Sequence, residues 1–197
     1  MTEVLATTPG LYPLPDWAKD ELSDLKGHQK GDLVDGDKGH QRDDLISGDE
    51  SEAITDTYDQ VRGELVDWQI EAGLDRIVEG QARWDDMLAH PLSVHENVET
   101  RGIVRYYDNN NFYRDPQVAG ELTPSGDVGE ELAAAADLLG DGDPPLQAVL
   151  PAPYSLADLA TDDHHGDSRE FLSAIASFLA GEVESFPEHE TLFVLDP

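Results

Sequence analysis

The side chains that could carry chemistry lie in a few short polar segments. Residues 162–165 read Asp-Asp-His-His, which could bind a metal ion, but a solvated loop before a helix is the favoured interpretation. Asp85 and Asp86 could work as an acid and a base, yet acids occur throughout the chain and a plain surface pair is favoured. Tyr113 and Arg114 are the better candidates to face a ligand, because they lie where a predicted strand ends. The sequence has no Ser–His–Asp order, P-loop or G-x-G-x-x-G motif.

The composition argues against several classes of partner and site. The 197 residues include 43 Asp and Glu against 12 Lys and Arg, a formal net charge of -31. This charge repels phosphate backbones and anionic membrane surfaces, so we expect no nucleic-acid or membrane binding. Cysteine is absent, which excludes disulfides, thiolate nucleophiles and cysteine-ligated metals within the sequence. An acid-rich, lysine-poor composition is typical of a halophilic cytoplasmic protein, because concentrated salt screens the repulsion between acids.

Disorder and membrane insertion are two general alternatives to a folded cytoplasmic protein. High net charge and low hydropathy are typical of disorder, but 39% of the residues are apolar, and five Phe, six Tyr and three Trp suffice for a core. The N-terminus lacks a cationic segment followed by a long apolar run, and no stretch approaches ~18 consecutive apolar residues. We therefore expect a folded protein in the cytoplasm.

Short apolar runs alternate with amphipathic segments along the chain. The periodicity predicts strands at 4–8, 74–79, 103–107, 146–150 and 191–196. It predicts helices over 51–72, from residue 80 to 88, over 130–139 and around 171–183, the last capped by Asp167 or Ser168. This alternation indicates βαβ units, and hence an α/β fold in which helices pack outside a parallel sheet.

Residues 24–50 form a polar insert with a 12-residue duplication. The sequence Gly-His-Gln-Lys at 27–30 recurs as Gly-His-Gln-Arg at 39–42, each followed by a similar acidic segment. Two copies are too few for a solenoid, and the acid spacing does not match a calcium loop. A local duplication in a surface loop or helix-loop region is the favoured interpretation.

Four segments, in order, resemble one protein family. They read TTPGLYPLP, GLDRIVEGQARWDDM, NNNFYRDPQVAGEL and PAPYSLADLA, and the closing TLFVLDP is similar to the family's Ile-Asp-Glu-Pro strand end. The family is cobalamin-independent methionine synthase (5-methyltetrahydropteroyltriglutamate–homocysteine methyltransferase), in its short archaeal form, and the resemblance covers residues 4–197. It implies a single domain over 1–197, the N-terminal part of a TIM-like (β/α)8 barrel with about five of the eight parallel strands.

The resemblance also implies an activity, a cofactor and partners. Members transfer a methyl group from a folate, or in archaeal relatives from a corrinoid protein, to homocysteine in methionine biosynthesis. Zinc lowers the pKa of the homocysteine thiol in the complete enzyme. The family's zinc ligands, a His, two Cys and a Glu, lie further along the barrel, so we assign no metal ligand and no catalytic residue here. We expect zinc for the complete enzyme and not for this chain alone.

The family's substrate-binding positions fall on four residues of this chain. Gly10 belongs to the opening motif, and Leu11 stands where the family has a serine that binds the amino acid. Gln81 stands where the family has a glutamate that faces the amino group. Asp196 could keep the carboxylate role of the fifth strand end.

Tyr154 joins Tyr113 and Arg114 as a further residue that could face a ligand. It lies in the segment similar to the family's Gly-Pro-Tyr-Thr turn, where Ala152 replaces the glycine. Scaffold-like positions thus match the family while several ligand-facing positions differ.

Three functional interpretations remain open. The first is a methionine-synthase-like methyltransferase chain, truncated or acting with a chain that supplies the remaining strands. The second is a non-catalytic paralogue that binds a partner subunit or an amino-acid-like ligand. The third is a relative in the wider group of zinc-thiol methyltransferases and uroporphyrinogen decarboxylases. We expect the isolated chain to be inactive for lack of zinc ligands, and to self-associate through its open sheet edges.

Overall fold

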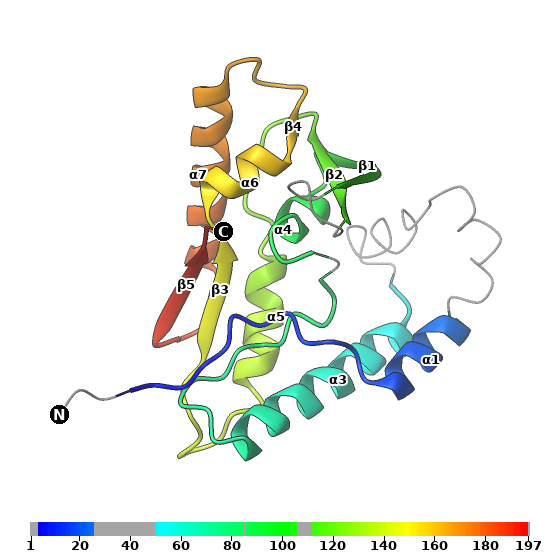
Figure 1. Ribbon diagram of the computed structural model, residues 1–197, viewed down its shortest axis with the longest axis vertical. Coiled ribbons are helices and arrows are strands. Elements are labelled where there is room, and N and C mark those ends of the chain that lie inside the picture. The colour runs from blue at the N-terminus through cyan, green and yellow to red at the C-terminus, as the bar shows by residue number, and fades with distance from the viewer. Residues whose placement is uncertain (1–3, 26–49, 85, 106–111, 197) are drawn as a thin grey trace.

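The computed structural model describes residues 4–25, 50–84, 86–105 and 112–196 (Figure 1). The duplication at 27–49 lies outside these residues. The described chain is a mixed α/β fold. Its helices are α1 (Asp16–Leu25), α3 (Glu52–Glu71), α4 (His90–Ser93), α5 (Asp127–Ala136), α6 (Pro153–Leu159) and α7 (Ser168–Glu184). Its strands are β1 (Val98–Arg105), β2 (Phe112–Val118), β3 (Gln147–Pro151), β4 (Thr161–Asp162) and β5 (Thr191–Leu195).

Two of the predicted strands form a parallel sheet. β3 and β5 pair in parallel, with Val149 opposite Phe193, and lie side by side in Figure 1. A parallel bridge between Ile77 and Leu146 extends this arrangement to the predicted strand at 74–79. Residues 4–8, predicted as a strand, form no strand, although the N–H of Asp75 donates to the carbonyl of Ala6 over 2.8 Å. Parallel pairing is therefore present for β3, β5 and the bridge at Ile77, but the described strands do not make a five-stranded barrel wall.

The predicted parallel strand at 103–107 is wrong. Its described residues belong to β1, which pairs with β2 in an antiparallel hairpin, with Val104 opposite Tyr113. Antiparallel strands need only a short connection, whereas a parallel pair needs a crossover of about a dozen residues or more. The described apolar residues of this run do not lie in the core, since Ile103 is 64% and Val104 37% exposed. β2 itself is not apolar enough to be recognised, because it contains Arg114, Asp115 and Pro116.

The longest predicted helices are confirmed, and one shorter helix is wrong. α3 buries Tyr58, Val61 and Leu65 on one face, as the spacing predicts. The carboxylate of Asp167 caps α7 and accepts from two backbone N–H groups in its first turn. The described residues of the segment from 80 to 88 are not helical and precede the short α4. The chain enters it through left-handed φ values of 105° at Gly80 and 58° at Gln81, which a right-handed helix does not allow.

The core has two parts. The larger packs β3 against α5, α6 and α7, with Leu132, Leu150 and Phe178 almost fully buried. The smaller packs α1 against α3 through Leu22 and Leu65. Among the helices that the structure describes, none combines the length and apolar character needed to cross a bilayer.

Candidate functional site

Two segments meet where the predicted strands at 4–8 and 74–79 end. The backbone N–H of Leu11 donates to Oε1 of Gln81 over 2.7 Å, and the N–H of Tyr12 donates to the carbonyl of Gly80 over 3.0 Å. Gly10 comes so close that a Cβ on it would lie 2.4 Å from Oε1 of Gln81. The structure thus brings together three predicted site residues, Gly10, Leu11 and Gln81, in a contact that we call the Leu11–Gln81 clasp.

The clasp contains unusual backbone geometry. Leu11 and Gln81 have φ values of 55° and 58°, in the left-handed region that residues with a Cβ rarely adopt. Each such residue costs about 1–3 kcal/mol and persists only where neighbouring contacts fix it, often at functional sites. The two strained residues are bonded to each other although 70 positions separate them in the sequence. This coincidence is the strongest structural indication of a site at these strand ends.

The clasp fixes the orientation of the Gln81 amide. Because Leu11 presents a donor N–H, the side-chain oxygen of Gln81 must face it. Nε2 of Gln81 is then a donor with no hydrogen-bond partner in the part of the chain that the structure describes. Gln81 therefore brings a neutral donor to the site, where a glutamate would bring a negative acceptor.

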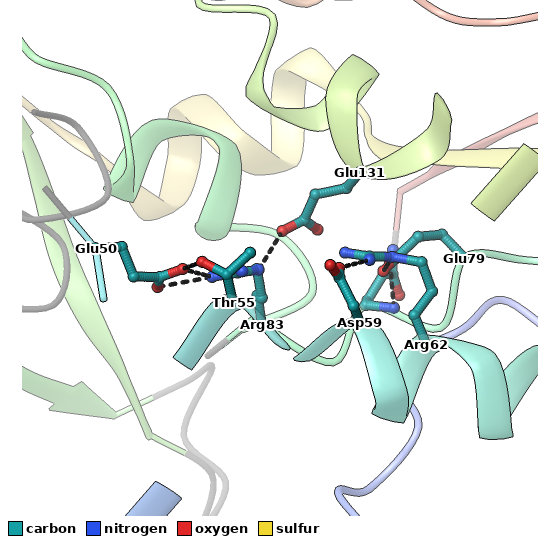
Figure 2. Close-up of polar contacts among 8 residues, drawn as sticks. Glu50, Thr55, Asp59, Arg62, Glu79, Arg83 and Glu131 are labelled. Atoms are coloured by element: carbon teal, nitrogen blue, oxygen red, sulfur yellow. Dashed lines mark hydrogen bonds and ion pairs between the residues drawn. The ribbon is translucent and has the colours of Figure 1, made fainter. Parts of the chain in front are cut away.

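Glu79 accepts a hydrogen bond from the backbone of Gln81 and forms a buried ion pair with Arg62. Oε2 of Glu79 accepts from the N–H of Gln81 over 2.5 Å, and Oε1 accepts from Nε of Arg62 over 3.0 Å (Figure 2). The side chains of Arg62 and Glu79 are each only 5% exposed. Burial raises the pKa of Glu79, and the positive charge of Arg62 opposes this effect. Burial lowers the pKa of Arg62, but the charges of Glu79 and Glu131 and the hydrogen bonds to Asp59 and Glu79 together outweigh it, so the net direction is upward.

Arg83 forms the second half of this arrangement. Its Nη1 donates to both carboxylate oxygens of Glu50 over 2.8 Å, and its Nε lies 3.3 Å from Oε1 of Glu131. The guanidinium also lies 4.4 Å from the ring centroid of Tyr58, a cation–π contact. Figure 2 shows Glu131 reaching from α5 toward Arg83. We call the six charged residues the buried charge network: Glu50, Asp59, Arg62, Glu79, Arg83 and Glu131. Asp59, whose side chain is 56% exposed, lies at its edge, and the other five are at most 16% exposed.

Glu131 also has a strongly raised pKa. Burial is the largest cause and the negative charge of Glu79 is the next, and together they raise its pKa to about 8. The charges of Arg83 and Arg62 oppose the rise without cancelling it. Glu131 is therefore mostly protonated at neutral pH.

The sequence contains one indication of this network, the position of Arg62, that the motifs did not reveal. Arg62 lies four residues after Tyr58 and three before Leu65, so it falls on the buried stripe of α3. A cation on a buried helical face needs an acidic partner. Glu79 and Glu131 carried no comparable signal in a chain with 43 acids.

The remaining predicted site residues are spread over other elements. Oδ1 of Asp196 accepts from the Ser155 hydroxyl over 2.5 Å, which ties the end of β5 to α6. Tyr154, beside Ser155, is 66% exposed. The Tyr113 hydroxyl donates to a backbone carbonyl at the end of α6, and Arg114 lies in β2 opposite Ile103. Ser155 is a strand-end partner of Asp196 that the sequence analysis did not identify.

The residues of this chain do not fit the zinc site of the family. The whole sequence lacks cysteine, and no three His, Asp or Glu residues gather as a metal site within the described ranges. In segment 162–165, Asp162 accepts from the backbone N–H groups of His164 and His165. Burial tends to raise the pKa of Asp162, but these bonds, the His165 ring and Gly166 outweigh it and lower the pKa to about 2. Asp162 thus organises the loop before α7.

Two solved structures are similar in fold to this chain. The structure of a B12-independent methionine synthase from Shewanella sp. W3-18-1, in complex with selenomethionine, has a TM-score of 0.58 and 18% identity, covering 69% of this chain and 40% of that one. A putative vitamin-B12 independent methionine synthase from Listeria monocytogenes has a TM-score of 0.61 and 14% identity, covering 98% of this chain and 52% of that one.

These similarities extend to the fold and not to a protein family. No family model matches it, and no curated protein does. The chain spans about half, or less, of the length of the two solved structures. At such low identity the likeness shows the fold alone. The described residues therefore have a fold like that of the B12-independent methionine synthases.

Proposed function

We propose that this chain is a methionine-synthase-like methyltransferase chain that supplies the amino-acid-binding part of the site. It transfers a methyl group to homocysteine only together with further barrel strands that carry the zinc ligands. The observation that supports this proposal is the Leu11–Gln81 clasp. It joins the ends of two neighbouring segments of a fold that resembles methionine synthases, and chemistry gathers at such strand ends.

Zinc chemistry has to be completed from outside the described residues. The sequence has no thiol, so a His, two Cys and a Glu would come from the added strands. β5 pairs with β3 and with no other strand that the structure describes, and its Val194 is 54% exposed. An exposed parallel edge of this kind is a place for a further strand to pair, from a partner chain or from a second copy. A folate or a corrinoid protein would supply the methyl group, and the cytoplasm of a salt-adapted cell would be the location.

The Gln81 amide favours a second candidate function. A neutral donor cannot form an ion pair with the ammonium group of an amino acid, so Gln81 weakens the ligand site relative to a glutamate. A non-catalytic paralogue that binds an amino-acid-like ligand or a partner subunit fits this change. The two functions differ in turnover, and a paralogue that binds an amino-acid-like ligand would hold it at the clasp, as the methyltransferase would.

Calorimetric titration with homocysteine and with methionine tests the ligand site. We expect measurable binding to the unmodified chain, loss of binding in Gln81→Leu, and about tenfold tighter binding in Gln81→Glu, which restores a charge-assisted bond. Gln60→Leu, at an exposed position of α3, is the matched control. Equal behaviour of all four folded proteins would overturn the placement of the site.

A methyl-transfer assay separates the two functions. The chain with zinc, homocysteine and a methyl-folate should show no turnover alone, because the thiol has no activating ligand set. Turnover by the chain alone would contradict the need for further strands. Turnover that appears only when a chain bearing the His and Cys ligands is added would support the methyltransferase over the non-catalytic paralogue.

A further inference from the structure

The Gln81 side chain has one polar atom that is engaged and one that is open. Its Oε1 accepts from the N–H of Leu11 over 2.7 Å, while Nε2 has no partner among the described residues. Gln81 as a whole is only 5% exposed. Nε2 does not belong to the buried side-chain atoms that lack a partner, so the small accessible part of Gln81 includes this nitrogen. A mostly buried side chain therefore presents a single donor group at the clasp.

The two ends of the Gln81 amide cannot exchange places. A flipped amide would set the Nε2 donors against the N–H of Leu11, and two donors form no hydrogen bond. The backbone of Gln81 is fixed as well, because Oε2 of Glu79 accepts from its N–H over 2.5 Å. On the next residue, the carbonyl of Gly80 accepts from the N–H of Tyr12 over 3.0 Å. The fold thus determines which end of the amide faces a ligand.

A donor in this position selects its ligand by hydrogen-bond polarity. An ammonium group carries only N–H donors and no acceptor, so it cannot form a hydrogen bond with Nε2 of Gln81. An oxygen acceptor can form this bond, and it gives a partner to a polar group that otherwise has none. Gln81 therefore favours a ligand that carries an oxygen where an amino acid carries its ammonium group.

The charges near Gln81 favour a neutral oxygen over a carboxylate oxygen at this nitrogen. The Glu79 carboxylate is bonded to the backbone N–H of Gln81, and it would repel a second negative group held close by. Arg62 does not offset this repulsion freely, because Asp59 and Glu79 already bind it. The net charge of -31 adds repulsion at longer range. A carbonyl oxygen accepts from the same donor without carrying a charge to the site.

We propose that the clasp binds a 2-oxo acid, an amino-acid-like ligand in which a carbonyl group replaces the ammonium group at C2. The carbonyl oxygen accepts a hydrogen bond from Nε2 of Gln81. This ligand class deepens the second candidate function above, and it rests on the placement of an amino-acid-like ligand at the clasp. Gln81 is then the residue that decides between an oxo and an ammonium substituent.

Calorimetric titration of the full chain with three acids of one carbon framework tests the proposal. The probes are 4-methylthio-2-oxobutanoate, 4-methylthiobutanoate and methionine, which carry an oxo group, no substituent and an ammonium group at C2. Titration in about 1 M KCl screens the net charge of the chain, which repels the two anionic probes. We expect the oxo acid to bind about fivefold more tightly than the unsubstituted acid, the effect of one ordinary hydrogen bond. It should bind about tenfold more tightly than methionine.

Gln81→Glu should invert this preference. The carboxylate keeps one acceptor for the N–H of Leu11 and turns a second acceptor, with a negative charge, toward the ligand. Methionine should then bind about tenfold more tightly than the oxo acid. Gln60→Glu makes the same change at an exposed position of α3, and this control should keep the order of the unmodified chain. Circular dichroism confirms that each variant is folded.

The order of the three affinities needs no variant, so it tests the proposal even where Gln81→Glu does not fold. Equal binding of the oxo and the unsubstituted acid, or tighter binding of methionine, would overturn the preference for a 2-oxo acid. The same holds if a folded Gln81→Glu keeps the order of the unmodified chain. These results would leave an amino-acid-like site at the clasp intact. Absence of binding for all three probes would overturn both the 2-oxo acid and the site proposed above.

Discussion

The backbone N–H of Leu11 and the side-chain oxygen of Gln81 hold two left-handed residues together over 2.7 Å. Neither conformation is favourable alone, and each is stabilised by the other's position. Gly10 is the residue that makes the approach possible, because a side chain there would occupy the place of the Gln81 amide. The clasp therefore depends on three residue types in a fixed arrangement.

Gly10→Ala should disrupt this clasp. The new Cβ would lie 2.4 Å from Oε1 and 2.9 Å from Cδ of Gln81, and Gly10 has a φ of 91° that alanine resists. We expect a loss of about 2–4 kcal/mol in the free energy of unfolding, from overpacking and backbone strain together. Urea unfolding measures it. Gly63→Ala is the matched control, since its Cβ meets nothing within 4 Å in α3, and it should stabilise by about 0.5–1 kcal/mol. Similar values for the two variants would contradict the close contact.

Local patterns made the two longest helices, α3 and α7, predictable from the sequence. The apolar spacing of α3 and the Asp167 cap of α7 are each contained within one element, so no tertiary information was needed. The pairing of β1 was not predictable in this way, because an apolar run does not reveal whether its partner is parallel or antiparallel. The direction of pairing depends on β2, whose sequence is only weakly apolar.

Part of the candidate site was predictable, but through resemblance to a family and not through local patterns. Gly10, Leu11 and Gln81 were found through resemblance to a family, since nothing in their spacing shows that they touch. The buried charge network was missed because Arg62 and Glu131 come from helices far apart in the sequence. The buried stripe of α3 marks Arg62 in the sequence, but only tertiary contact distinguishes Glu131 from the many exposed acids of the chain.

Breaking the Arg62–Glu79 pair should be far more costly than removing both charges. Arg62→Met leaves Glu79 buried without its partner, and we expect a loss of about 3–5 kcal/mol in unfolding free energy. The double variant Arg62→Met with Glu79→Gln should recover a large part of this loss, because no unpaired charge remains. Chemical denaturation of the unmodified chain, the single variants Arg62→Met and Glu79→Gln, and the double variant forms a double-mutant cycle.

The exposed pair of Lys19 and Asp16 supplies the control for that cycle. Its side chains are 54% and 97% exposed, so Lys19→Met should change stability by less than about 1 kcal/mol. A similar loss at both pairs would show that Arg62 is not buried with Glu79.

Glu131→Gln should change how stability depends on pH. The pKa of Glu131 is about 8 in the folded chain, above its ordinary value of 4.5, so the folded state binds the extra proton between these values. Its contribution is therefore fully present below about pH 4.5 and is lost as the pH rises through 8. Thermal melts across this range should show a smaller decline in the glutamine variant than in the unmodified chain. An identical decline in the two proteins would contradict the raised pKa.

The net charge of -31 should make folding depend on salt. Acids such as Asp20 and Glu21 on α1 are exposed, and like charges repel more strongly when the screening distance grows from ~3 Å at 1 M salt to ~10 Å at 0.1 M. We expect the melting temperature, followed by circular dichroism, to rise steadily from 0.1 M to multimolar KCl. Neutralising Asp20 and Glu21 as Asn and Gln should reduce this rise, because fewer charges then need screening. A melting temperature independent of KCl would show that surface repulsion does not limit the stability of this chain.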